Sequence, residues 1–129
     1  MSLEQLSKHT LEISIYGGEL TPQCLIKNVA KVKKSFADLD KDFFEIFSDA
    51  IKRNKFSDER LNDAVNFVID NCVYPKPTIA QFISYDKKVK IYTYEELQNK
   101  VHIGDSFENY KNIGKGKFIR KIDAELYNL

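Results

Sequence analysis

The sequence predicts a mainly α-helical protein, in which a small bundle of three main helices and several short ones carries a minor extended or β appendage at its C-terminal end. Three amphipathic segments follow one another, and the apolar residues of each recur at spacings of three and four, which is typical of a buried helix face. Of the 129 residues, 43% are hydrophobic and 30% are charged, which is the composition of a folding chain. We expect an N-terminal arm over residues 1–20, either loosely held or a short helix, and a single domain over residues 21–129.

The three main helices have recognisable start and stop signals. Their predicted N-caps are Thr21, Asp38 or Asp40, and Ser57, whose side chains can accept from free backbone N–H groups. The predicted helices run from Pro22 to Phe36, from about Lys41 to Arg53 and from Ser57 to near Cys72. We expect Asn54 to end the second helix in the left-handed conformation. The third must stop near Cys72, because Pro75 restricts the backbone of Tyr74 before it.

Each main helix has a predicted apolar face. The residues assigned to these faces are Leu25, Ile26, Val29, Val32 and Phe36 in the first, Phe43, Phe44, Ile46, Phe47, Ala50 and Ile51 in the second, and Leu61, Ala64, Val65, Val68, Ile69 and Cys72 in the third. A face as wide as that of the second helix indicates either a central helix or a partner surface. We favour the central helix.

The C-terminal half shows shorter signals. Pro75 and Pro77 make a stiff, extended segment, after which Thr78 opens a short helix through a capping box with Gln81. Residues 88–94 alternate, with Val89, Ile91 and Thr93 on one side and Lys88, Lys90 and Tyr92 on the other, which predicts a short strand. Thr93 and Glu96 predict a second capping box, and thus a helix to about Val101. We expect a loop over residues 105–116, a strand from Lys117 to Ile122 and a last short helix capped by Asp123.

The cysteines and histidines are too scattered for a zinc site. Cys24, Cys72, His9 and His102 show no CxxC, HxxxH or HExxH spacing. We expect two buried, reduced thiols, since both cysteines fall at apolar positions of helical patterns. A disulfide would require the two helices to cross at these positions. No metal and no cofactor are expected.

Charge and hydropathy exclude other classes of protein. The formal net charge is +1, whereas domains that bind nucleic acid by bulk charge usually have a pI above about 9. No apolar run approaches the roughly 18 residues of a membrane span, and no apolar h-region follows a basic start. We therefore expect a cytoplasmic protein with no membrane partner.

A basic and aromatic cluster is the main candidate binding site. It consists of Tyr74, Lys76, Tyr85, Lys87, Lys88, Lys90, Tyr92 and Tyr94. Lysines can neutralise phosphates, and tyrosine rings can stack on unpaired bases, so the segment over residues 74–94 is consistent with a single-stranded nucleic-acid-binding module. The alternative is that the tyrosines pack their rings and the lysines extend into water, with Asp70 and Asp86 diluting the positive field.

Other motifs do not support catalysis. The run from Gly114 to Lys117 is rich in glycine and lysine but lacks the GxxxxGK[ST] pattern, so we expect a solvated turn. Asp38, Asp40 and Asp42 alternate as in a calcium loop, but the glycine and glutamate that an EF-hand needs are missing. No group of residues combines a nucleophile with a matched acid and base, so we expect no enzyme.

The run from Phe56 to Leu97 resembles a group of small proteins from prophages and mobile elements of gut bacteria. The residues that carry the resemblance are Tyr74, Pro75, Pro77, Thr78, Ile79, Ala80, Phe82, Ile83, Ser84, Tyr92, Thr93 and Tyr94. More distantly, Phe43 to Phe82 is similar in order and spacing to the helical N-terminal domain of bacteriophage helicase loaders, with three helices and then a Pro-Thr-Ile-Ala turn into a short helix.

The resemblance implies a non-enzymatic accessory protein of phage or mobile-element DNA replication, akin to a helicase loader or its regulator. Such a protein acts by protein–protein binding, with the replicative helicase or another replication protein as its partner. The ordered C-terminal half departs from the flexible tail of the loaders. Two alternatives remain: the single-stranded nucleic-acid-binding module described above, and an enzyme of unknown type, which no constellation supports.

Overall fold

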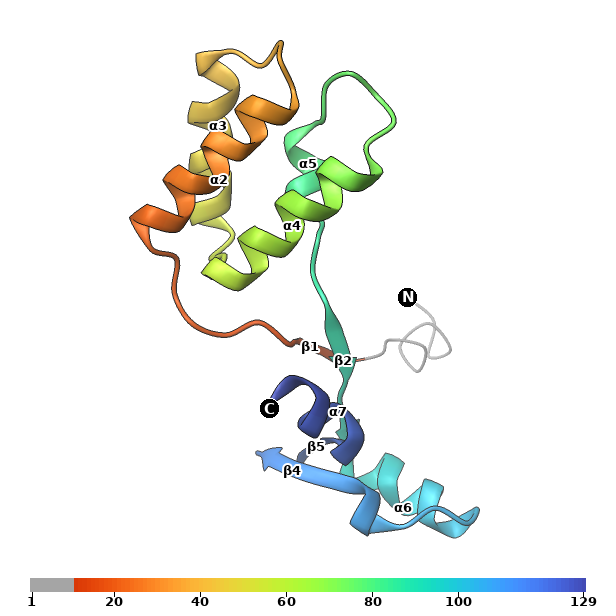
Figure 1. The fold of residues 1–129 in the computed structure, drawn as a ribbon. Helices are drawn as coiled ribbons and strands as arrows, with labels where there is room; N and C mark the ends of the chain where they lie inside the picture. The colour runs from red at the N-terminus through yellow and green to blue at the C-terminus, as the bar shows by residue number, and fades with distance from the viewer. Residues whose placement is uncertain (1–10) are drawn as a thin grey trace, which may run out of the picture. The chain divides into compact units, whose positions relative to one another are not determined.

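The chain is mainly helical with a small amount of antiparallel sheet, as seen in the computed structural model, which describes residues 11–129 (Figure 1). Two compact units form. The helical unit is Tyr16–Asp86, and the mixed unit consists of residues 11–15 together with Lys87–Leu129. The predicted mainly helical fold with a minor β part is thus confirmed. Folding of residues 21–129 as a single domain stays a prediction, and residues 1–10 of the predicted arm lie outside the described residues.

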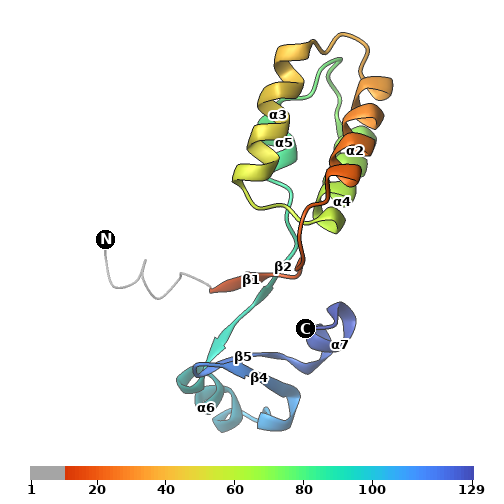
Figure 2. The same cartoon turned by 90° about the vertical axis from the view of Figure 1, so that its left-hand side faces the viewer.

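The helical unit is built from four helices whose starts the sequence predicts. They are α2 (Pro22–Ser35), α3 (Lys41–Arg53), α4 (Asp58–Asn71) and α5 (Ile79–Ile83). The side chains of Thr21, Asp40, Ser57 and Thr78 each accept a hydrogen bond from the backbone N–H three residues on, which confirms these four N-caps. Helix α2 packs against α4, and α3 packs against α5 (Figure 2).

The core of the helical unit centres on Phe47, whose side chain is fully buried. Its ring meets that of Phe82 edge to face, with 5.0 Å between the ring centroids, and stacks on that of Phe43 at 6.1 Å. The apolar face of α3 thus turns into the core through Phe44 and Phe47, while the helix itself packs on α5 and α2, with Ile46 exposed on its outer side. Arg60 caps the C-terminal end of α5, because its guanidinium donates to the carbonyl oxygens of Ile83 and Tyr85 at 3.1 and 2.9 Å.

Four details of the helical unit differ from the predictions. The predicted apolar faces were too wide, since Ile26 and Ile46 are 69% and 57% exposed. Asn28 is buried instead, and its amide donates to the carbonyl oxygen of Cys24 at 2.9 Å. Asn54 does not adopt the left-handed conformation, with a φ of −89°, whereas Lys55 does, with a φ of 55°. Both cysteines carry free thiols but are only half-buried.

The mixed unit contains two small antiparallel sheets and two helices. Its elements are β1 (Glu12–Ser14), β2 (Lys88–Lys90), β3 (Tyr92–Thr93), α6 (Tyr94–His102), the 3₁₀ turn η1 (Phe107–Asn109), β4 (Tyr110–Gly114), β5 (Lys117–Arg120) and α7 (Lys121–Tyr127). Strand β1 pairs with β2, and the second sheet has the order β3-β5-β4. The capping box of Thr93 and Glu96 that opens α6 is confirmed.

The three-stranded sheet of the mixed unit is covered on both faces. Because side chains alternate along a strand, Phe118 and Ile119 of β5 point to opposite faces. Phe118 packs with Tyr92, Tyr110 and Leu97 of α6, whereas Ile119 packs with Val89, Ile91 and Ala124 of α7. The sheet therefore separates two small apolar layers.

Several predictions in the mixed unit are wrong. The expected strand from Lys88 to Tyr94 is broken at Ile91 into β2 and β3, which belong to different sheets. The expected loop over residues 105–116 contains η1 and β4, and Gly114 to Gly116 forms the turn between β4 and β5 with positive φ angles. Helix α7 begins at Lys121 without a side-chain cap, so Asp123 lies inside its first turn. In the predicted arm, residues 12–14 form strand β1.

Candidate functional site

The predicted basic and aromatic cluster is divided between the two units. Tyr74, Lys76 and Tyr85 belong to the helical unit, and Lys87, Lys88, Lys90, Tyr92 and Tyr94 belong to the mixed unit. Of the residues expected to shape the chain here, Pro75 is exposed and Pro77 is buried in the segment between α4 and α5. The cluster that is continuous in the sequence therefore consists of two separate sets of residues, one in each unit.

Only two of the four tyrosines present an exposed ring. Tyr74 and Tyr94 are 68% and 54% exposed. Tyr85 is half-buried, with its ring centroid 5.2 Å from that of Phe67, and Tyr92 is buried against Tyr110, also at 5.2 Å. The expectation that Tyr92 lies on the lysine side of a strand is wrong, because the chain turns its ring beneath α6 after the break at Ile91.

The lysines of β2 are exposed, but one of them is already paired. Lys88 and Lys90 point outward on either side of the buried Val89. The ammonium of Lys90 lies 4.7 Å from the centroid of the Tyr92 ring and 3.8 Å from Oε2 of Glu96. Strand β1 places Glu12 opposite Lys90. These contacts weaken the positive field that a phosphate would meet.

An aromatic pair that the sequence did not predict lies at the start of α6. The ring of Tyr94 stacks on that of Phe107, with 6.0 Å between centroids and an interplanar angle of 16°. Phe107 is 43% exposed. No periodicity could have joined these residues, because they come from different elements.

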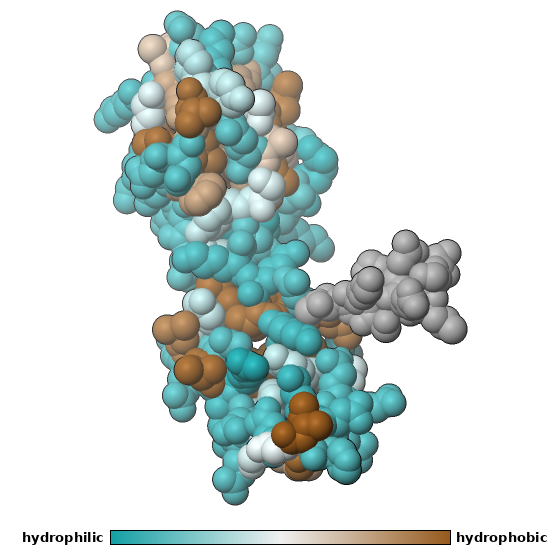
Figure 3. Space-filling view, turned by 90° about the vertical axis from the view of Figure 1, so that its right-hand side faces the viewer, coloured by the Kyte–Doolittle hydropathy of each residue, from teal (hydrophilic) through white to brown (hydrophobic). Residues whose placement is uncertain are grey.

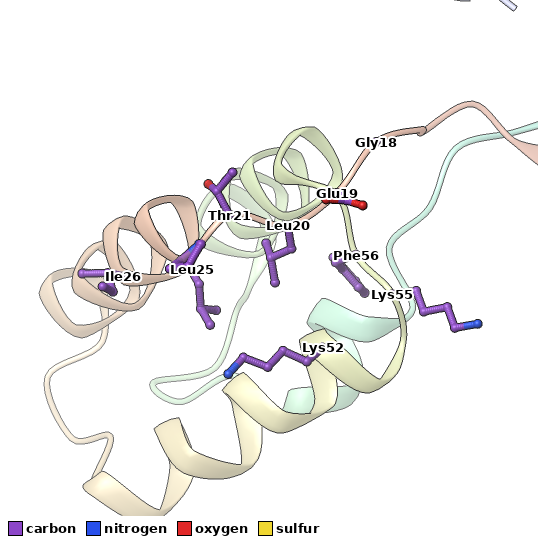
Figure 4. Close-up of a pocket in the computed structure, with 10 residues that line it drawn as sticks. Gly18, Glu19, Leu20, Thr21, Leu25, Ile26, Lys52, Lys55 and Phe56 are labelled. Atoms are coloured by element: carbon purple, nitrogen blue, oxygen red, sulfur yellow. The ribbon is translucent and has the colours of Figure 1, made fainter.

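The helical unit holds an open groove between the N-terminal end of α2 and the C-terminal end of α3 (Figure 4). Its volume is about 600 Å³. The residues that line it are Gly18, Glu19, Leu20, Thr21, Pro22, Leu25, Ile26, Lys52, Lys55 and Phe56. Aliphatic and aromatic side chains dominate, and the charged ones are two lysines and one glutamate. Such a lining is typical of sites that bind a largely apolar ligand or side chain.

One wall of the groove is a strap, defined as residues 16–21, which hydrogen bonds hold against α4. The backbone N–H of Thr21 donates to Oδ1 of Asp58 at 2.7 Å, and the Thr21 hydroxyl donates to Oδ2 at 2.9 Å. In return, the backbone N–H of Asp58 donates to the carbonyl oxygen of Glu19 at 3.2 Å. The hydroxyl of Tyr16 donates to Oδ2 of Asp63 at 2.7 Å. The wall is thus fixed by four hydrogen bonds.

The pKa values of two groups in these hydrogen bonds, Asp58 and Tyr16, are shifted. The backbone N–H of Thr21, and then its hydroxyl, stabilise the ionised carboxylate and lower the pKa of Asp58. Burial, followed by its hydrogen bonds to Tyr85 and Asp63, raises the pKa of Tyr16. Both shifts favour the protonation states in which the strap's hydrogen bonds form.

The interior of the groove is apolar and its rim is charged. Leu25 and Phe56 are 9% and 2% exposed, and the guanidinium of Arg60 stacks on the Phe56 ring at 3.9 Å. Figure 4 shows Leu20 and Leu25 pointing toward the end of α3, where the side chain of Lys52 runs along the opposite wall.

The sequence contained one overlooked signal for this groove. Successive residues of a helix point about 100° apart, so a stripe that includes both Leu25 and Ile26 must be wide, whereas the stripe that α2 buries is Leu25, Asn28 and Val32. Assigning both to one buried face concealed an exposed isoleucine beside the helix start. The contributions of Leu20 and Lys52 depend on tertiary packing and had no local signal.

Further exposed apolar residues occur in both units, and Figure 3 shows such side chains as brown patches on one face. They include Ile46, Phe67 and Val73 in the helical unit, and Ile103, Ile122 and Leu126 in the mixed unit. Within residues 11–129, no helix is long and apolar enough to cross a bilayer. Across the same residues, no three His, Cys, Asp or Glu side chains gather as metal ligands would.

Comparisons of this chain with protein-family models, with curated proteins and with solved structures gave no match.

Proposed function

We propose that this protein is a non-enzymatic accessory protein of phage or mobile-element DNA replication that docks on a replication protein through the groove of its helical unit. The resemblance to helicase loaders suggests the replicative helicase as the partner. The observation that supports binding is the open, mainly apolar groove between α2 and α3, with Ile26 69% exposed at its edge.

Apolar surface of this kind favours association with another protein. Burying apolar surface contributes about 25 cal/mol of favourable free energy for each Å² removed from water. Because hydrogen bonds already fix the strap, ordering that wall on binding costs little entropy. A side chain inserted beside Leu20 and Leu25 would meet aliphatic groups on both walls. An amphipathic segment in a groove is a recurrent way for small domains to recognise their partners.

Binding of single-stranded nucleic acid by the segment over residues 74–94 stays a prediction. It is supported by the exposed ring of Tyr94 and by the exposed lysines of β2. It ranks second, because Tyr92 is buried and Lys90 is paired with Glu96.

The test is a sizing run and a pull-down of the full chain with the host replicative helicase at micromolar concentration. We expect a complex, and we expect Ile26→Glu to weaken it at least tenfold by placing a charge at the edge of the apolar groove. Ile46→Glu is the matched control, since Ile46 is also an exposed isoleucine of a helix in this unit but does not line the groove.

Circular dichroism of both variants checks that the helices are retained. The proposal fails if no complex forms with the unmodified chain, or if the two variants weaken the complex equally.

A further inference from the structure

We infer that the groove takes an acidic amphipathic segment of a partner protein, with bulky apolar side chains for its interior and a carboxylate for Lys52. The inference rests on the proposed function, because it names the chemistry of the segment that would occupy the same groove. Four features support it: the apolar interior of the groove, the ammonium of Lys52 on the α3 wall (unpaired among the described residues), the ion pair that occupies the neighbouring Arg53, and the difference in charge between the two ends of the groove.

The interior selects apolar side chains. Leu25 and Phe56 form well-packed walls, and Leu20 from the strap is half-buried beside them. A polar group inserted here would lose its water without gaining a partner, which disfavours a purely polar occupant. Phosphate and sugar groups of a nucleic acid are of that polar kind.

The charge at the α3 wall selects an anion. Lys52 and Lys55 both line the groove, against the single carboxylate of Glu19. Arg53, which lies between them in the sequence, is occupied by an ion pair with Asp49, at 3.4 Å from Nε to Oδ2. Among the described residues, no carboxylate lies within ion-pair distance of Lys52. Its ammonium is therefore available to a carboxylate from outside.

The two ends of the groove differ. Figure 4 shows Glu19 and Lys55 extending toward the same end, where the opposite charges reduce the net field, although no ion pair joins them among the described residues. Lys52 runs toward Leu25, next to the apolar interior. A partner segment would fill the apolar interior and also reach Lys52 if a carboxylate follows its buried apolar side chains by about one helical turn. Residues three or four apart share a helix face.

The probes are two labelled peptides and an oligonucleotide. One peptide is a short amphipathic helix with leucines on one face and a glutamate one turn further along that same face, and its twin carries lysine in place of the glutamate. The third probe is a labelled single-stranded oligonucleotide. Fluorescence anisotropy with the full chain measures each affinity at low and at high salt.

We expect the acidic peptide to bind about three- to tenfold more tightly than its basic twin at low salt, with the difference shrinking at high salt. Lys52→Glu should abolish the preference. Lys34→Glu is the matched control, because Lys34 also lies in the last turn of a helix of this unit but does not line the groove. That variant should keep the preference.

The inference is overturned if the two peptides bind equally, if the basic twin binds more tightly, or if Lys34→Glu and Lys52→Glu act alike. It is also overturned if the oligonucleotide displaces the acidic peptide and loses affinity in Lys52→Glu. Failure of the proposed function looks different: the acidic peptide binds with the expected preference while the replicative helicase forms no complex. If Ile26→Glu weakens helicase binding but both peptides bind with equal affinity, the inference is wrong and the proposed function is retained.

Discussion

The two units bury their apolar residues in different ways. In the helical unit, Phe47 from the middle of one helix meets the aromatic rings of neighbouring elements and closes a single core. In the mixed unit, a thin sheet divides the apolar residues into two layers, one around Leu97 and one around Ile119. The single core includes the fully buried rings of Phe47, Phe56 and Phe82, whereas the two layers together contain fewer buried residues. The helical unit can therefore maintain a groove at its edge without exposing its centre.

The units also differ in how an aspartate fastens the backbone. Asp58 bonds to Thr21, which is 37 residues away, and thereby holds the strap of the groove. Asp105 bonds to residues of its own turn, with Ser106 N–H at 2.8 Å and the Tyr110 hydroxyl at 2.6 Å. The first carboxylate stabilises tertiary structure that forms a site, and the second stabilises a local connection.

The largest predicted effect concerns the single core of the helical unit. Phe47→Ala should lower the free energy of unfolding by about 3–5 kcal/mol, because it leaves a cavity among three aromatic neighbours. Urea unfolding followed by circular dichroism measures this change. Phe67→Ala is the matched control, since Phe67 is a phenylalanine of the same unit but is 50% exposed, and its loss should be clearly smaller. Equal losses for the two variants would contradict a core centred on Phe47.

The helical unit was largely predictable because its determinants are local. A cap such as Thr21 or Ser57 acts on the N–H three residues on, and an apolar stripe acts within one helix. The bounds of α3 match the predicted bounds. The wrong assignments were those that require a neighbour to be known. Ile26 has the same hydrophobicity as a core residue, but α4 packs against a different side of α2.

The mixed unit was less predictable because its strands are short and paired across the chain. Strand β4 is polar at Lys111 and Asn112 and contains a register shift before Gly114, so it has no alternating pattern to detect. Strand β1 pairs with β2 from more than seventy residues away. The candidate groove had the same difficulty, since its walls come from the strap, α2 and α3. Local propensity contains no information about such juxtapositions.

The next largest predicted effect is the loss of stability when either of the two confirmed capping boxes is removed. Thr93→Ala should cost about 1 kcal/mol of stability, because Thr93 satisfies the backbone N–H of Glu96 at the start of a nine-residue helix. Thr78→Ala should cost no more, since it heads a helix of five residues. Thermal unfolding measures both. Thr93→Ser keeps the hydroxyl and should restore most of the loss, and a serine variant as unstable as the alanine variant would show that the cap is not the cause.

The smallest effect is a pH dependence of the turn in the mixed unit. Hydrogen bonds from the Tyr110 hydroxyl, the Asn109 amide and the Ser106 N–H lower the pKa of Asp105 to about 2. Because the folded state favours the carboxylate, its stabilisation is complete above the ordinary carboxyl pKa of about 3.9 and is lost as the pH falls through about 2. An NMR titration of the Asp105 carboxyl carbon measures the midpoint.

Tyr110→Phe should raise this midpoint toward the ordinary value, because it removes the first of the three bonds, whereas Tyr127→Phe in the same unit should leave it unchanged. If Tyr110→Phe does not move the midpoint, the local bond does not hold the turn, and the contrast with Asp58 is lost.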